Sequence, residues 1–144
     1  MKTLYKAILL LPVLLSAMWC TTTFAEVKVI VHSSVADSSA SANVVSDIFL
    51  GKAKTLPSKT KVTPIDQEED EAPRDEFYSK VVGKDASQLK AYWSRLIFTG
   101  KGQPPRSYYD DDEVIEMVMD NPNLIGYVSG DADTSGVKVL LTTP

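Results

Sequence analysis

The stretch D-A-S-Q-L-K-A-Y-W-S-R-L-I-F-T-G-K-G, residues 85–102, has the clearest local pattern in the chain. Asp85 followed by Gln88 is the pattern of a helix capping box, and Gly100 offers a left-handed residue after the last turn. Large apolar residues recur between them at intervals of three and four, which predicts one buried helical face made of Leu89, Tyr92, Trp93, Leu96 and Ile97. We therefore expect a helix over residues 85–98 at the centre of the core, and a polar loop after it as a candidate functional surface.

The N-terminus has the pattern of a secretion signal. A lysine-containing start precedes an apolar run, residues 7–17, and Ala25 is the small residue that a signal peptidase prefers. The run is shorter than the ~20 apolar residues of a bilayer-spanning helix, so no stable membrane insertion is expected. We predict a signal peptide over residues 1–25 with cleavage after Ala25, one domain over 26–144, and a periplasmic location.

Composition narrows the class of protein further. Cys20 is the only cysteine and is removed with the signal, so a hydrophobic core and not disulfides must hold the mature domain together. The formal net charge is -4, and the loss of the two lysines in the signal takes it to -6. This acidic balance argues against nucleic acid and anionic membranes as partners.

Strands and helices alternate along the mature sequence. In chain order we expect a strand at 27–31, a helix between a Ser41 or Asn43 cap and Gly51, a strand at 62–65, a helix between Pro73 and Gly83, the helix at 85–98, a helix after an Asp110 cap, and strands at 125–128 and 137–141. This alternation predicts an α/β sandwich of about four strands and four helices.

No catalytic or metal-binding motif is complete. His32 is the only histidine, which excludes a His-based triad or zinc cluster within one chain. Two Ser-x-x-Lys matches, at 58–61 and 87–90, lack the partner motifs of penicillin-recognising enzymes. Residues 131–136 match half of a calcium loop, but Thr142 stands where the bidentate Glu belongs. We therefore expect no enzyme, no metal and no cofactor.

Two segments suggest binding. The Ser-rich segment after strand 27–31 offers hydroxyl and N–H donors at a helix N-terminus, where phosphate or another oxyanion could bind through Ser33 and Ser34; an exposed turn is the alternative. A solvated helix start explains the acidic run 66–76, and binding of a basic partner or, weakly, of a divalent cation is the alternative.

Four segments, in this order, resemble the phosphate-binding proteins of ABC phosphate transporters, and more closely small one-lobe relatives of them. They are D-I-F-L-G-K at 47–52, F-Y at 77–78, Y-W-S-R-L-I-F-T-G-K-G at 92–102 and N-P-x-x-I-G-Y-V at 121–128. The resemblance implies an α/β domain that is a single lobe of a type 2 periplasmic-binding-protein-like fold.

The same resemblance implies where the chain departs from the family. In the two-lobed relatives one lobe contributes an Arg and a Ser-Gly-Thr at a helix N-terminus, and here that place falls at residues 71–73, Glu-Ala-Pro. Pro73 has no N–H and Glu71 would repel an anion. The residues that we expect to contact an oxyanion, from the resemblance and the donor pattern together, are Ser33, Ser34, Arg74, Thr99 and Lys101.

The expected function is therefore that of an exported, non-enzymatic solute-binding-protein-like domain that binds phosphate or a similar oxyanion. Its expected protein partner is an ABC transporter permease or another periplasmic protein. A single lobe leaves a ligand half solvated, so a second copy of the chain could cover it as a homodimer. The alternative is a ligand-free interaction or sensory module that docks through the acidic segment 66–76.

Overall fold

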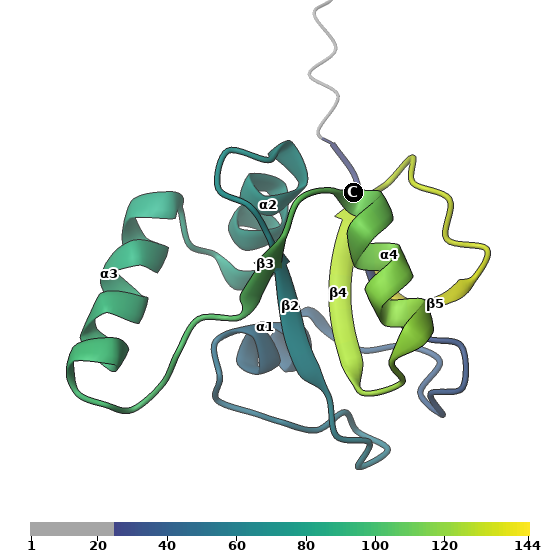
Figure 1. The fold of residues 1–144 in the computed structure, drawn as a ribbon, viewed down its shortest axis with the longest axis horizontal. Coiled ribbons are helices and arrows are strands. Elements are labelled where there is room, and N and C mark those ends of the chain that lie inside the picture. The colour runs from purple at the N-terminus through teal and green to yellow at the C-terminus, as the bar shows by residue number, and fades with distance from the viewer. Residues whose placement is uncertain (1–24) are drawn as a thin grey trace, which may run out of the picture.

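The computed structural model describes residues 25–144, so the predicted signal peptide lies outside the described residues except for Ala25. In chain order the elements are β1 (Val27–His32), α1 (Ala42–Phe49), β2 (Thr63–Gln67), α2 (Ala72–Phe77), the π-helical segment η1 (Tyr78–Val82), α3 (Ala86–Phe98), β3 (Arg106–Tyr108), α4 (Asp111–Asp120), β4 (Leu124–Ser129) and β5 (Val137–Thr143) (Figure 1). The predicted alternation of strands and helices is confirmed.

The strands form one mixed sheet in the order β3-β2-β4-β1-β5. β2 is parallel to β3 and β4, whereas β1 is antiparallel to both β4 and β5. The carboxyl ends of β2, β3 and β4 therefore lie at one edge of the sheet, beside the start of β1. The sheet contains β3 in addition to the four predicted strands, because residues 106–108 of the loop after α3 pair with β2.

Local capping signals place the helix ends where the sequence predicts them. Ser41, one of the two candidate caps of α1, accepts a hydrogen bond from a backbone N–H of the first turn, and Asp110 does the same for α4. Asp85 and Gln88 form both hydrogen bonds of the capping box at the start of α3. Gly100, with φ of 68°, follows that helix in the left-handed conformation.

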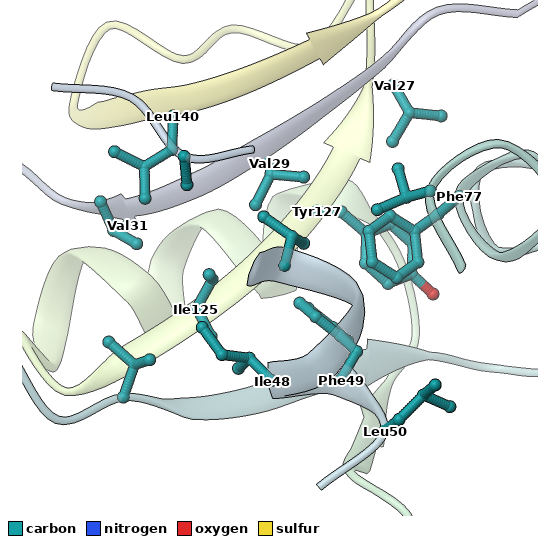
Figure 2. Close-up of a cluster of buried hydrophobic side chains, with 14 of the residues drawn as sticks. Val27, Val29, Val31, Ile48, Phe49, Leu50, Phe77, Ile125, Tyr127 and Leu140 are labelled. Carbon is teal, nitrogen blue, oxygen red and sulfur yellow. The ribbon is translucent and has the colours of Figure 1, made fainter. Parts of the chain in front are cut away.

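The core lies on both faces of the sheet. On one face, α1, α2 and η1 cover β1 and β4, and the rings of Phe77 and Tyr127 stack in parallel with centroids 4.1 Å apart (Figure 2). The Phe49 ring packs against Phe77 at 4.6 Å. On the other face, α4 places Val114 and Val118 over a second buried cluster. Together these layers form one α/β domain.

The predicted apolar face of α3 contributes to the core but does not form its centre: Leu89 and Trp93 belong to the buried cluster, and Tyr92 and Leu96 pack against it. The helix lies beside the sheet, on the side opposite to α4 (Figure 1), and touches the end of α1 through the Tyr92 hydroxyl, which donates to the Leu50 carbonyl over 2.6 Å. Leu89 and Trp93 are buried, but Ile97 is 47% exposed and the neighbouring Phe98 is 93% exposed. The spacing of apolar residues correctly identified a helix with one apolar face, and it carried no information about how much of that face the rest of the chain covers.

Gly126 in β4 provides a test of the packing between the sheet and α4. A Cβ atom added at Gly126 would lie 2.8 Å from Cγ1 of Val114 and 3.2 Å from Cγ1 of Ile65. We expect Gly126→Ala to lower the free energy of unfolding by ~1–3 kcal/mol, because the site is already full. Gly102→Ala is the control, since its nearest neighbour would be at 3.6 Å. Urea denaturation measures both, and an equal effect of the two substitutions would contradict the packing described here.

Candidate functional site

The candidate site lies at the edge of the sheet where β2 and β4 end. Ligands of α/β proteins bind outside the carboxyl ends of the strands, where loops and helix N-termini converge. Here the starts of α2 and α4 meet this edge and enclose a shallow cavity of about 280 Å³. Its lining, which we call the carboxyl-edge site, consists of Gln67, Glu71, Pro73, Asp110, Asp111 and Asp112.

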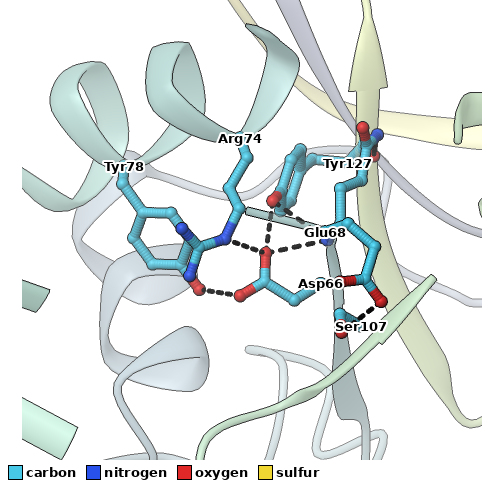
Figure 3. A network of polar contacts seen from close by, with 7 residues as sticks. Asp66, Glu68, Arg74, Tyr78, Ser107 and Tyr127 are labelled. Atoms are coloured by element: carbon cyan, nitrogen blue, oxygen red, sulfur yellow. Dashed lines mark hydrogen bonds and ion pairs between the residues drawn. The ribbon is translucent and has the colours of Figure 1, made fainter. Parts of the chain in front are cut away.

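Beneath this site lies the buried carboxylate of Asp66, the next-to-last residue of β2. The Tyr78 hydroxyl donates to Oδ2 over 2.7 Å, and the Tyr127 hydroxyl donates to Oδ1 (Figure 3). The backbone N–H of Gln67 also donates to Oδ1, over 2.9 Å. Arg74 Nε lies 3.6 Å from Oδ1, and its guanidinium carbon is 5.3 Å from the centre of the Tyr78 ring. Asp66 therefore joins three separate elements to β2.

Burial controls the ionisation of this cluster. It raises the pKa of Asp66 above its ordinary value of 3.8, while the hydrogen bonds from Tyr127 and Tyr78 and the charge of Arg74 oppose that rise. Burial, with the nearby Asp66 charge, also raises the pKa of both tyrosines. Both hydroxyls therefore stay protonated and serve as donors to the carboxylate.

A second carboxylate, Asp111 in the first turn of α4, occupies the donors of the carboxyl-edge site itself. Gln67 Nε2 donates to Asp111 Oδ1 over 2.7 Å and to the Tyr127 carbonyl over 3.0 Å. The Ser129 N–H donates to Asp111 over 3.2 Å, and the Ser129 hydroxyl donates to Oδ2. An amide N–H, a backbone N–H and a hydroxyl would suit a bound oxyanion, and here the protein's own carboxylate accepts all three.

The surroundings of this internal carboxylate also oppose a second anion. Glu71, Asp110 and Asp112 line the same cavity. Helix α2 has six residues, begins after Glu71 without a side-chain cap, and has Pro73 in its first turn, where no N–H is available. The charge and the missing donors agree with the sequence-based expectation for residues 71–73.

The structure places the predicted oxyanion contacts in three separate places. Ser33 and Ser34 follow β1, whose end pairs with the start of β4, so they lie at the sheet edge opposite to the carboxyl-edge site. Ser34 contacts His32 Nδ1 through its hydroxyl, at 2.7 Å, and through its N–H, at 3.1 Å. Arg74 lies near the carboxyl-edge site but points inward to Asp66.

Thr99 and Lys101 lie at the far end of α3. The Thr99 hydroxyl donates to the Arg95 carbonyl over 2.8 Å, and the backbone N–H of Lys101 donates to the Leu96 carbonyl over 2.8 Å. These donors complete the end of the helix. The five predicted contacts are thus not brought together, and their role in binding stays a prediction.

Sequence reasoning missed Gln67, Asp111, Tyr127 and Ser129. Gln67 and Ser129 are the last residues of two strands, a position that could have marked them, but only the three-dimensional fold joins them to Asp111.

Within residues 25–144 no group of three or more His, Cys, Asp or Glu side chains could hold a metal ion. The partial calcium loop at 131–136 connects β4 and β5 as a turn. In the same part of the chain, no helix has the length and apolar character needed to cross a bilayer.

Comparison with solved structures identifies the fold. A protein described as a phosphate ABC transporter substrate-binding protein from Clostridium perfringens, solved with bound phosphate, superposes with a TM-score of 0.60 at 18% sequence identity, over 81% of this chain and 45% of that one. A phosphate transport receptor from Vibrio cholerae gives 0.61 at 15% identity, over 81% and 46%. PstS from Borrelia burgdorferi gives 0.60 at 13%, over 81% and 46%.

These likenesses confirm a single lobe of a type 2 periplasmic-binding-protein-like fold. The chain spans less than half of the length of each of these structures. The sequence matches no model of a known protein family, and a comparison with curated proteins finds no significant match. The similarity to these structures therefore shows the fold alone.

The raised pKa of Asp66 predicts how stability depends on pH. Between pH 3.8 and the raised pKa, the folded protein binds more protons than the unfolded chain, so this group makes stability fall as pH increases. An Asp66→Asn variant lacks that titration, so its stability relative to wild type should rise with pH across the same window. Urea denaturation of both proteins on either side of the window measures this, and a constant difference would show that burial does not govern the group.

The internal carboxylate predicts a second stability effect. Asp111→Ala would leave two Ser129 donors and one of the two Gln67 amide hydrogens without an acceptor, while the other amide hydrogen keeps the Tyr127 carbonyl; we expect this to cost ~1–3 kcal/mol. Asp112→Ala is the matched control, because this exposed neighbour shares only the favourable helix-dipole interaction, about 0.3–1 kcal/mol. Thermal unfolding compares them, and a loss no larger for Asp111→Ala than for Asp112→Ala would refute the internal role of Asp111.

Proposed function

Because the chain has the fold of one solute-binding lobe, we propose that it is an exported, solute-binding-protein-like domain of a phosphate uptake system that docks onto a partner protein and does not itself hold phosphate. The observation that carries this proposal is the position of the Asp111 carboxylate, which already accepts the hydrogen bonds that an oxyanion would need. The partner would be an ABC transporter permease or another periplasmic protein.

The acidic segment 66–76 supports docking because several of its carboxylates are exposed and uncommitted. Asp66 is buried in the tyrosine cluster, Glu76 pairs with Lys80 at 3.0 Å, and Glu68 accepts a hydrogen bond from the Ser107 hydroxyl over 3.0 Å. The remaining exposed carboxylates are those of Glu69, Asp70 and Asp75. They give this side of the domain a negative potential that would attract a basic surface.

Phosphate or oxyanion binding is the second candidate. It is favoured by the names of the similar structures, which are phosphate-binding or phosphate-transport proteins. A single lobe would then need a second copy of the chain, or another protein, to cover the ligand. Ser33, Ser34, Arg74, Thr99 and Lys101 are the residues proposed to contact it, without a cofactor, and since they lie in three separate places one molecule would present only one of these groups to a given anion.

We also propose that the protein is not an enzyme and that it acts in the periplasm. The similar structures carry the names of binding and transport proteins, which supports a non-catalytic role. Export rests on the N-terminal sequence pattern, with its apolar run and its small residue at position 25.

A thermal-shift titration separates the two candidates. A ligand that binds only the folded state stabilises it by about 2.7 kcal/mol at a hundredfold excess over Kd. We expect no change in Tm with millimolar phosphate relative to sodium chloride of matched ionic strength, because the donors are occupied and the site is acidic. Sulfate serves as the control oxyanion.

A phosphate-specific rise in Tm would overturn the docking proposal in favour of the second candidate. In that case Ser34→Ala and Lys101→Ala, which lie at separate places in the fold, would show which region contacts the anion. The variant that loses the rise identifies the region, and the other serves as its control.

A further inference from the structure

A groove of about 490 Å³ separates α3 from the segment that joins β2 to α2. Its lining combines apolar side chains with charged ones, in a list that includes Glu69, Asp70, Asp75, Leu89, Trp93 and Ile97. The groove exists because α3 lies beside the sheet and not on it (Figure 1). It is separate from the cavity of the carboxyl-edge site, with which it shares no lining residue.

The floor of the groove is apolar. Leu89 and Trp93 are nearly buried beneath it, Ile97 continues the same helical face toward solvent with 47% of its surface exposed, and Pro104 also lines the groove. The exposed apolar area is small, comes mainly from Ile97, and is bordered by charged residues. A large apolar side chain from another molecule would cover it.

The rim of the groove is acidic. Glu69, Asp70 and Asp75 make no side-chain hydrogen bond or ion pair within residues 25–144. The positive charge of Arg74 is directed to Asp66, so Lys90 on α3 is the cation left to oppose the three carboxylates. The rim therefore favours a positively charged occupant.

We propose that this groove binds a segment of a partner protein in which one large apolar side chain is flanked by lysine or arginine residues. The apolar side chain would lie over Trp93 and Ile97, and the basic residues would meet the acidic rim. A second copy of this chain is a poorer match, because both molecules would carry the same excess of negative charge. The inference rests on the proposed docking function and adds to it the surface and the chemistry of the partner.

A peptide titration tests the proposed chemistry. The probe is a fluorescent peptide with one phenylalanine between two pairs of lysines, and the two matched peptides replace phenylalanine by serine or the lysines by glutamate. Fluorescence anisotropy with the full protein should give a Kd about tenfold or more weaker for each matched peptide, and added salt should weaken binding of the first. Equal binding of the serine peptide would overturn the apolar part of the proposal.

Substitutions in the protein locate the binding site. Ile97→Ser, and separately the pair Asp70→Asn with Asp75→Asn, should each weaken binding of the phenylalanine peptide by about fivefold. Phe98→Ser is the control for Ile97, since this residue is its more exposed neighbour outside the groove lining, and Asp47→Asn on α1 is the control for the carboxylates. Unchanged Tm values establish that all variants are folded.

The proposal is overturned if the groove variants bind the peptide as wild type does, or if the controls lose binding equally. A dimer in sedimentation experiments that Ile97→Ser dissociates would assign the groove to a second copy of the chain and also overturn it. The phosphate titration is independent of these outcomes. A rise in Tm that only phosphate causes would refute the proposed docking function. If the groove variants bind the peptide as tightly as the wild-type protein does, only the proposal for the groove is refuted.

Discussion

The carboxylate of Asp66 is the interaction on which the rest of the structure depends. It lies inside the protein, where an uncompensated charge would be very costly, and donors from η1, β4 and the backbone together with Arg74 of α2 offset that cost. The same contacts fix the rings of Tyr78 and Tyr127 at the end of the sheet. Phe77 stacks on Tyr127 at 4.1 Å, so the polar cluster and the aromatic core hold α2 and η1 in one position.

The second carboxylate, Asp111, does for α4 what Asp66 does for α2. It ties the first turn of the helix to the ends of β2 and β4, at the place where the architecture of α/β proteins directs ligands. At this place the protein's own carboxylate accepts the hydrogen bonds of the donors that lie there. Fold and ligand are separable properties, so a shared fold does not carry a shared ligand.

The sequence predicted the features that neighbouring residues determine, and it did not predict those that depend on contacts between distant segments. The caps at Ser41, Asp85 and Asp110 were predictable because the capping residue and its partners are neighbours in the chain. The position of α3 was not predictable, because the spacing of its apolar residues is the same whether another helix or solvent covers that face. The short strand β3 escaped prediction because three residues carry little pattern. The contact between Gln67 and Asp111 joins residues 44 positions apart, and no spacing rule connects them.

The place of β1 in the sheet has a consequence for biogenesis. The first strand of the domain lies between β4 and β5, and the backbone N–H of Val27 bonds to the Thr143 hydroxyl across 116 positions of sequence. β1 therefore cannot pair on either side until β4 and then β5, near the end of the chain, are available, and contacts of such long range form slowly. We expect the domain to stay unfolded while its C-terminus is still being synthesised.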